Sequence, residues 1–232
     1  MIGKDRKAAR EIAGRFLQKG DALGWFEELY SQADGDPSII PWADLEPNPN
    51  LVEWLDAQRA AGNGSRALKI GCGLGDDAEE LNRRGFVTTA FDISLSAIAW
   101  CRGRFTDSKV DYSVADLFHL APSWSKTFDL VVESYTLQVL PPDLRSKAIE
   151  AVADLVAENG TLLVIARARN EEDPAGTMPW PITRSEMQEF KTYALLEKSF
   201  EDYMDREEPP VRRFRATYNR KTTENAQPSA SV

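Results

Sequence analysis

Three glycines and one aspartate have the types and spacing of a nucleoside-binding site. Gly71, Gly73 and Gly75 alternate directly after a short apolar run, and Asp92 ends the next apolar run. Glycine has no Cβ atom, so the backbone there can lie against a flat ligand. A carboxylate at the end of the second strand of such a unit can accept hydrogen bonds from ribose hydroxyls. These residues predict a nucleoside site in a strand, turn, helix and strand unit.

Strand and helix patterns alternate along most of the chain around this unit. Such alternation is typical of an α/β fold, here a doubly wound, Rossmann-like and mainly parallel sheet. The runs 194–203 and 211–218 are separated by Glu207-Glu208-Pro209-Pro210 and predict a C-terminal antiparallel hairpin at the sheet edge. We therefore expect seven strands, namely 67–70, 87–91, 109–114, 127–133, 161–166 and the two of the hairpin.

Helix signals lie between these runs. Ser94 is expected to cap a helix over 94–105, and a second helix is expected over 143–157. Thr183 and Glu186 have the spacing of a capping box at the start of a third helix. Asp76 and Glu79 have the same spacing after the glycines, and predict a capping box there too.

The N-terminal part of the chain is expected to cover the ligand site. Two amphipathic helices precede a loop over 34–50; Asp21 is the expected N-cap of the second, which carries Trp25. Proline at this density bars helix, and Trp42 lies in an apolar stretch of the loop that we interpret as a lid. Core packing is the alternative reading of both tryptophans. The predicted divisions are a helical cap and lid loop at 1–63, a ligand-binding core at 64–218 and a disordered tail at 219–232.

Composition narrows the classes of function. The 232 residues carry a net charge of −9, which argues against nucleic acid and anionic membrane surfaces as partners. No apolar run approaches the ~20 residues that span a bilayer, and a charged N-terminus favours a cytoplasmic protein. One histidine, His119, and two separated cysteines make no typical metal site. The basic run 212–215 is interpreted as a charged strand face. Both a monomer and a homodimer stay open.

The residue at position 76 separates two kinds of nucleotide ligand. The dinucleotide fingerprint is Gly-x-Gly-x-x-Gly, and Asp76 stands where its third glycine would fall. A carboxylate at a helix N-terminus repels a pyrophosphate placed there. S-adenosylmethionine (SAM), an adenosine joined to a zwitterionic amino acid with no phosphate, meets this requirement.

Five segments in order resemble the motifs of class I SAM-dependent methyltransferases. The resemblance covers about residues 64–168 and rests on 69–75, 91–94, 115–117, 128–132 and 158–163. It implies that Gly71, Cys72 and Gly73 run beside the methionine moiety and that Asp92 holds the ribose. It further implies that Ile93 packs on adenine, that Asp116, followed by Leu117, accepts from its amine, and that Glu133, Ser134 and Tyr135 face the methyl group.

Two details refine this resemblance. The family usually has an acid where this chain has Lys69, so another acceptor must hold the amino group of SAM; backbone carbonyls near Gly71 and the Glu133 carboxylate are the candidates. The segment 178–183, together with the aromatic N-terminal helix and the Trp42 loop, is similar to the thiopurine and tellurite-resistance methyltransferases. That similarity implies a small-molecule acceptor with a soft nucleophile, such as a thiol, selenium or tellurium.

Glu133 and Tyr135 are the candidate catalytic residues, because His119 reads as a surface or packing residue. A thiolate attacks a methyl group unaided, whereas an alcohol or amine needs a general base. Three alternatives stay open at this point. They are an O- or N-methyltransferase of a small aromatic metabolite, an NAD-dependent oxidoreductase and a SAM-binding protein without catalysis.

Overall fold

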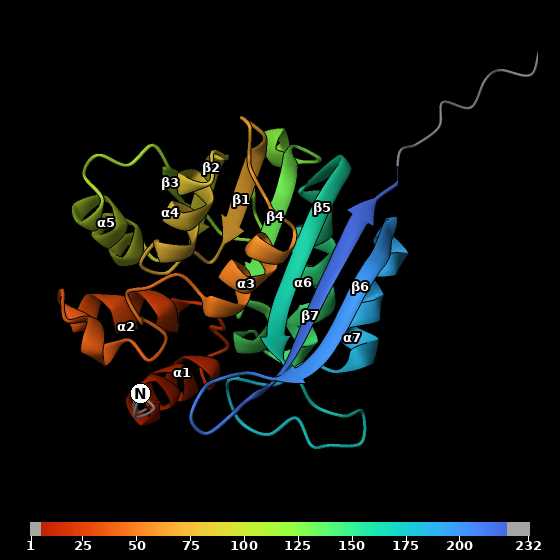
Figure 1. Cartoon of the computed structure of the whole chain (residues 1–232). Coiled ribbons are helices and arrows are strands. Elements are labelled where there is room, and N and C mark those ends of the chain that lie inside the picture. The colour runs from red at the N-terminus through yellow and green to blue at the C-terminus, as the bar shows by residue number, and fades with distance from the viewer. Residues whose placement is uncertain (1–5, 222–232) are drawn as a thin grey trace, which may run out of the picture.

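The computed structural model describes residues 6–221, which form one seven-stranded sheet flanked by helices. The strand order is β3-β2-β1-β4-β5-β7-β6, and β7 runs in the direction opposite to the other six strands (Figure 1). The expected α/β fold with a mainly parallel sheet and a C-terminal antiparallel hairpin is confirmed. The strands are β1 Arg66–Ile70, β2 Val87–Asp92, β3 Asp111–Val114, β4 Phe128–Ser134, β5 Val156–Arg167, β6 Leu195–Met204 and β7 Arg212–Arg220.

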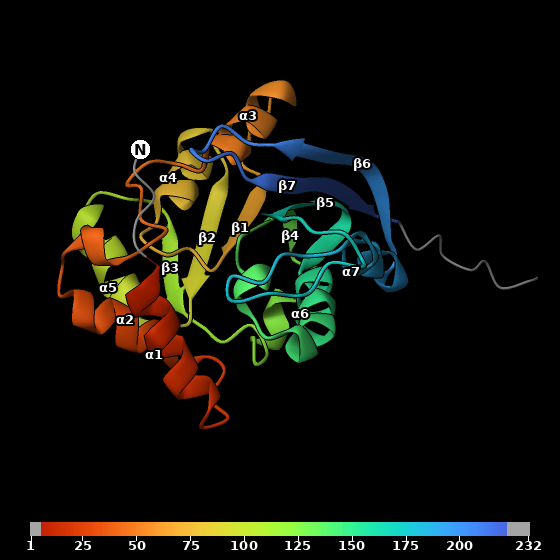
Figure 2. The same cartoon turned by 90° about the horizontal axis from the view of Figure 1, so that it is seen from below.

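Helices cover both faces of this sheet (Figure 2). Side chains alternate along a strand, so neighbouring residues of β1 enter different layers. Ala67 packs with Leu51 and Leu55 on one face, whereas Leu68 and Ile70 pack on the other. The helices are α1 Lys7–Leu17, α2 Gly24–Ala33, α3 Pro49–Ala57, α4 Asp76–Arg83, α5 Leu95–Arg104, α6 Pro142–Asp154 and α7 Arg184–Glu189.

Two of the four predicted caps form. The N-cap expected at Asp21 is wrong, because α2 begins at Gly24 with Leu23 at its N-cap, and Asp21 accepts from the amides of both. The Ser94 hydroxyl accepts from the amide of Ala97 at the start of α5, and Thr183 and Glu186 make the predicted capping box of α7. Helix α4 has Gly75 at its N-cap and no side-chain cap, so the capping box expected there is wrong. The carboxylates that would have formed it have other partners, described with the site.

The strand after α6 is longer than its sequence pattern suggests. It begins at Val156 rather than 161, and α6 ends at Asp154 rather than 157. A register shift between Phe128 and Leu130 of β4 lets Val156 pair with the strand before the turn at Gly160. A Cβ atom on Gly160 would lie 2.9 Å from the carbonyl oxygen of Phe128, so glycine permits this approach.

The last strand enters the region expected to be a disordered tail. Strand β7 continues through Arg220, because Asn219 pairs with Thr161 of β5 and Arg220 pairs with Leu195 of β6. The Arg220 guanidinium also donates to the carbonyl oxygen of Val156 at 2.7 Å. The start of the tail at 219 is therefore two residues too early, and 222–232 lie outside the described residues.

The N-terminal helices lie across the carboxyl edge of the parallel strands (Figure 1). Helices α1 and α2 form an apolar cluster that includes Trp25 and also takes in Leu74 of the glycine turn and Ala97 of α5. Helix α3 packs on the sheet itself instead. The strand order reverses between β1 and β4, and ligands of open α/β sheets bind outside the strand ends at such a point.

Candidate functional site

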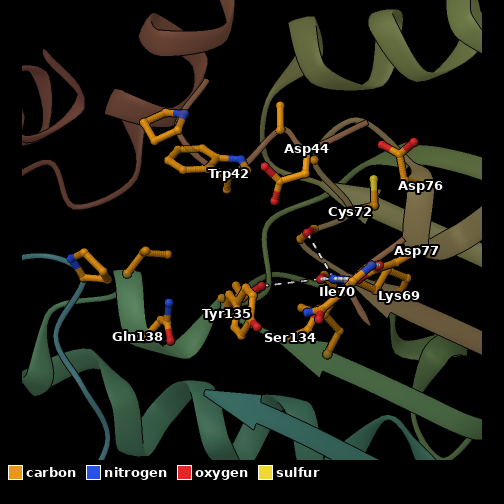
Figure 3. A pocket seen from close by; sticks show the side chains of 18 of the residues that line it. Trp42, Asp44, Lys69, Ile70, Cys72, Asp76, Asp77, Ser134, Tyr135 and Gln138 are labelled. Carbon is orange, nitrogen blue, oxygen red and sulfur yellow. Dashed lines mark hydrogen bonds and ion pairs between the residues drawn. The ribbon is translucent and has the colours of Figure 1, made fainter. Parts of the chain in front are cut away.

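A cavity of about 1530 Å³ opens at this reversal point, over the ends of β1, β2 and β4. Its walls come from the N-terminal segment on one side and from the loop after β4 on the other, with Trp42 and Tyr135 across from each other (Figure 3). Most of the residues predicted for the site line it, namely Trp42, Gly71, Cys72, Gly73, Asp92, Ile93, Asp116, Leu117, Ser134 and Tyr135.

The glycine turn has the backbone that its residues predict. Gly71 and Gly73 both have φ of +55°, a left-handed conformation that side chains rarely adopt. A Cβ atom on Gly71 would lie 2.5 Å from the Thr136 hydroxyl oxygen. Gly75, also left-handed, is the N-cap of α4 and does not line the cavity. A Cβ atom there would lie 2.6 Å from the Tyr112 hydroxyl oxygen. Gly71 and Gly73 therefore border the cavity, and Gly75 shapes the turn.

Asp92 joins the glycine turn to the next helix. Its Oδ2 accepts from the amide of Gly73 at 3.0 Å, and its Oδ1 accepts from the amide of Ser94 at 3.0 Å. The side chain is 6% exposed, and burial raises the pKa of its carboxyl while these amides lower it. The amide of Ile93 also stabilises this carboxylate. A carboxylate has about four lone-pair sites, so Asp92 is held by backbone amides and can still accept from a ligand.

The acids at the start of α4 are held by groups outside their own helix. Both oxygens of Asp76 accept from the Arg104 guanidinium at 2.8 Å, and Glu79 accepts from the Tyr112 hydroxyl at 2.7 Å. A bidentate guanidinium is a stronger partner than a helix amide, which explains why the capping box does not form. Asp76 still lines the cavity, and its charge disfavours a pyrophosphate at this helix N-terminus.

Lys69 turns back over the end of its own strand. Its Nζ donates to the carbonyl oxygens of Ile70 at 2.7 Å and Gly71 at 3.3 Å, and lies 3.8 Å from Oδ2 of Asp77 (Figure 3). The backbone carbonyl of Gly71, suggested above as an acceptor, therefore already accepts one hydrogen bond. Asp77 also accepts from Ser134 Oγ at 3.0 Å. An acid thus lies on the cavity wall beside Lys69, supplied by α4 instead of β1.

Glu133 does not line the cavity, in contrast to its expected position facing the methyl group. Side chains alternate along β4, so Glu133 shares a face with Val131 and not with Ser134. It is 0% exposed, and its Oε1 accepts from the amides of Thr136 at 2.7 Å and Leu137 at 2.9 Å. Its Oε2 has no hydrogen-bond partner among residues 6–221. Burial raises the pKa of this carboxyl to about 7.

Tyr135 lines the cavity in a strained backbone conformation. Its φ is +67°, which is uncommon for a bulky residue and typical of strained ligand sites. Its hydroxyl accepts from Asn50 Nδ2 at 2.9 Å, and the Arg213 guanidinium lies 4.4 Å from its ring centre. Burial raises the pKa of the phenol, so Tyr135 keeps its proton.

The two tryptophans have different positions. Trp25 is buried in the N-terminal cluster and does not line the cavity, so its expected ligand contact is replaced by core packing. Trp42 is half-buried, lines the cavity and donates from Nε1 to the Tyr30 hydroxyl at 2.7 Å. Trp25 packs edge-on against Trp42, with 6.0 Å between the ring centres.

The third-strand acid has local partners. Oδ1 of Asp116 accepts from the amide of Phe118 at 2.9 Å, and Oδ2 lies 2.7 Å from Nδ1 of His119. The His119 side chain is exposed, as its reading as a surface residue predicts. Ile93 and Leu117 lie beside Asp116 on the cavity wall.

Residues that the sequence did not single out complete the cavity. Asp77, Asn48 and Gln138 line it, as do Arg167 at the end of β5 and Arg213 at the start of β7. Only Arg213 carried a sequence signal, as part of the basic run 212–215. Within the described chain, no group of three or more acids, histidines or cysteines could hold a metal ion, and no helix is long and apolar enough to cross a bilayer.

Comparisons with known proteins agree with this geometry. Residues 67–160 match the family model described as a methyltransferase domain. The ubiquinone biosynthesis O-methyltransferase of Xanthomonas campestris pv. campestris (strain B100) is 33% identical over 119 residues, which are 50% of this chain and 48% of that protein. The chain thus spans about half the length of the curated relatives it matches.

Solved structures show the same fold. The N-methyltransferase NodS from Bradyrhizobium japonicum WM9, in complex with S-adenosylhomocysteine (SAH), superposes with a TM-score of 0.66 at 20% identity, over 87% of this chain and 99% of that chain. The Burkholderia thailandensis 1,6-didemethyltoxoflavin-N1-methyltransferase, with SAH bound, gives 0.66 at 15% identity, over 92% and 91%. Residues 67–160 thus match a methyltransferase domain, and the sheet has the fold of these two solved methyltransferase structures.

Proposed function

We propose that this protein is a SAM-dependent methyltransferase that acts on a small molecule. The observation that carries the proposal is Asp92, a buried carboxylate that accepts from the amide of Gly73 in the glycine turn and lines the cavity. It lies within the segment that matches the methyltransferase domain. The acids at the start of α4 argue against the NAD-dependent alternative, because a pyrophosphate would lie against them.

Each wall of the cavity then has a role in binding the cofactor. When bound, SAM supplies an electrophilic methyl group. Asp77 takes the role of the acid that the family has at position 69 and accepts a hydrogen bond from the amino group of the cofactor. Glu133, the earlier candidate for this acceptor, does not line the cavity. Trp42 covers the cofactor from the N-terminal side. The other proposed contacts are Gly71, Cys72, Gly73 and Ser134 along the methionine part, Asp92 at the ribose, and Ile93, Asp116 and Leu117 at the adenine.

The nature of the acceptor follows from the two residues named as catalytic candidates. Glu133 lies outside the cavity lining and Tyr135 keeps its proton, so neither supplies a ready base. This favours an acceptor that ionises unaided, such as a thiol, or a selenium or tellurium nucleophile. An acidic phenol is the second candidate, because matched relatives carry the name O-methyltransferase.

Binding of SAM and SAH tests the proposal directly. Calorimetry should detect both ligands with the full chain, and Asp92→Ala should weaken SAH by about 10- to 100-fold, the range of a hydrogen bond to a charged group. Asp107→Ala, an exposed acid outside the cavity, is the matched control. A wild-type protein that binds neither compound would end the proposal.

Turnover separates an enzyme from a binding protein. Transfer of labelled methyl from SAM should be measured for thiols, selenite, phenols and amines. Transfer to any of them supports catalysis. Binding of SAH without transfer to any member of the panel would favour a SAM-binding protein instead.

A further inference from the structure

Two arginines lie directly opposite each other at the edge of the cavity. Arg167 ends β5, and its register partner in the antiparallel strand β7 is Arg213. Both line the cavity. Like charges placed directly opposite across two strands are destabilising, so the fold alone gives no reason for this pair.

Acidic neighbours accept from only some of the hydrogen-bond donors of these two guanidiniums. Arg213 is 1% exposed; its Nε donates to Asp205 Oδ2 at 2.6 Å and its Nη2 donates to Glu207. Its Nη1 is buried and has no hydrogen-bond partner among residues 6–221. The Arg167 guanidinium reaches Glu207 only at 3.9 Å and donates no hydrogen bond within the same residues. The donors of Arg167 are therefore left for a ligand, and one nitrogen of Arg213 is unpaired.

Positive charge is in excess at this end of the cavity. Burial, together with the charges of Arg6 and Arg213, lowers the pKa of Arg167 to about 10. Arg10 lines the same cavity and donates from Nε to the carbonyl oxygen of Met178 at 2.7 Å. With Arg206, these guanidiniums outnumber the carboxylates of the neighbouring cavity residues Asp205, Glu207 and Glu208.

The strand order places the pair away from the expected position of the cofactor. The glycine turn follows β1, whereas β5 and β7 lie two and three strands further along the sheet. At ~4.8 Å between neighbouring strands, the arginines lie roughly 10–15 Å from that turn. This is the acceptor end of the cavity, not the end that would hold the methionine part of SAM.

We propose that Arg167 and Arg213 bind a carboxylate of the methyl acceptor, so that the substrates of this enzyme are small carboxylic acids. The proposal rests on the proposed function. A guanidinium fork matches a carboxylate in two parallel hydrogen bonds. A carboxylate fits better than a phosphate, because Asp205 and Glu207 lie beside the pair and would repel a second negative charge.

Matched pairs of probes test this charge requirement. Calorimetry on the SAH-saturated protein compares 3,4-dihydroxybenzoate with its amide, indole-3-acetate with its amide, and 3-mercaptopropionate with its amide. In at least one pair the acid should bind about tenfold or more tightly than the amide, as expected for hydrogen bonds between charged groups. In Arg167→Gln this preference should fall to about twofold or less while the affinity for SAH is unchanged.

Arg212→Gln is the control variant. Arg212 is the neighbour of Arg213 in β7, but it pairs with Asp202 at 2.7 Å and does not line the cavity, so the preference should survive. Arg167→Gln should also melt no lower than the wild type, because it removes a repulsion; a merely structural arginine would lower the melting temperature.

The other outcomes are decisive too. Amides binding as well as acids in every pair, or a preference that survives Arg167→Gln, would overturn the proposal. A loss of SAH affinity in Arg167→Gln would also overturn it, because the arginine would then bind the cofactor. Binding of phenyl phosphate by a protein that binds none of the three acids would overturn it as well. A wild type that fails to bind SAH would overturn the proposed function alone, and the pairs would then be titrated without SAH.

Discussion

At the scale of single residues, the acids around the glycine turn differ in the direction their side chains take. Asp77 and Asp92 border the cavity, but Glu133 enters the opposite layer of the sheet and accepts two amides of the loop after β4. That loop carries Tyr135, so Glu133 can act on the site only by positioning it. Its burial without a cationic hydrogen-bond partner has a consequence for stability.

Glu133 should make the protein less stable as the pH rises. Burial raises the pKa of its carboxyl to about 7 in the folded state, from the ordinary value of 4.5. The folded state therefore binds the extra proton, and the stability present below pH 4.5 is lost as the pH rises through 7. The difference corresponds to about 3 kcal/mol. Urea unfolding at pH 5, 6.5 and 8 should show this loss for the wild type relative to Glu133→Gln.

Glu133→Gln removes the titrating group and keeps the shape of the side chain, so charges elsewhere cancel in the comparison. Parallel stability profiles for the two proteins would mean that Glu133 is ionised in the folded state at all three pH values.

At the scale of elements, α2 stabilises the start of α5 from outside that helix. Glu27 of α2 accepts from the hydroxyls of Ser94 and Ser96 at 2.7 and 2.6 Å and from the amide of Ser96 at 3.1 Å. A carboxylate at a helix N-terminus also interacts favourably with the helix dipole. Because the Ser94 amide donates to Asp92, this contact links the N-terminal helices to Asp92 at the cavity wall.

Removing this contact should therefore loosen two elements at once. Glu27→Ala should cost about 0.5–2 kcal/mol, the range for the loss of a helix cap. Thermal unfolding measures the loss, and calorimetry should show weaker SAH binding in the same variant. Glu28→Ala is the control, because Glu28 accepts only from Gln32 of its own helix at 2.6 Å. Equal effects of the two substitutions would contradict a specific role for Glu27.

At the scale of the whole molecule, the cofactor should join the N-terminal helices to the sheet. A ligand present at 100 times its dissociation constant stabilises the folded state by about 2.7 kcal/mol. For a chain of this size, that predicts a rise in melting temperature of about 5–10 °C with SAH. At the same SAH concentration, Asp92→Ala should reduce the rise to about half or less. NADH should not produce it. A shift with NADH equal to that with SAH would favour the dinucleotide alternative.

The sequence by itself determined the features that depend on neighbouring residues. The glycine turn at 71–75, Asp92 at the end of the next strand and the alternation of strands with helices are local patterns, and each has a direct steric or periodic cause. Their combination identified the fold, the cofactor and most of the cavity lining.

Only the tertiary structure decided how distant segments meet. The pairing of Arg167 with Arg213 depends on the antiparallel register of β5 and β7, and the contact between Asp77 and Lys69 depends on how α4 packs over β1. The direction of the Glu133 side chain depends on which residue of β4 enters which layer. Such contacts leave no local pattern, because their energies depend on packing and register between segments that the chain brings together only on folding.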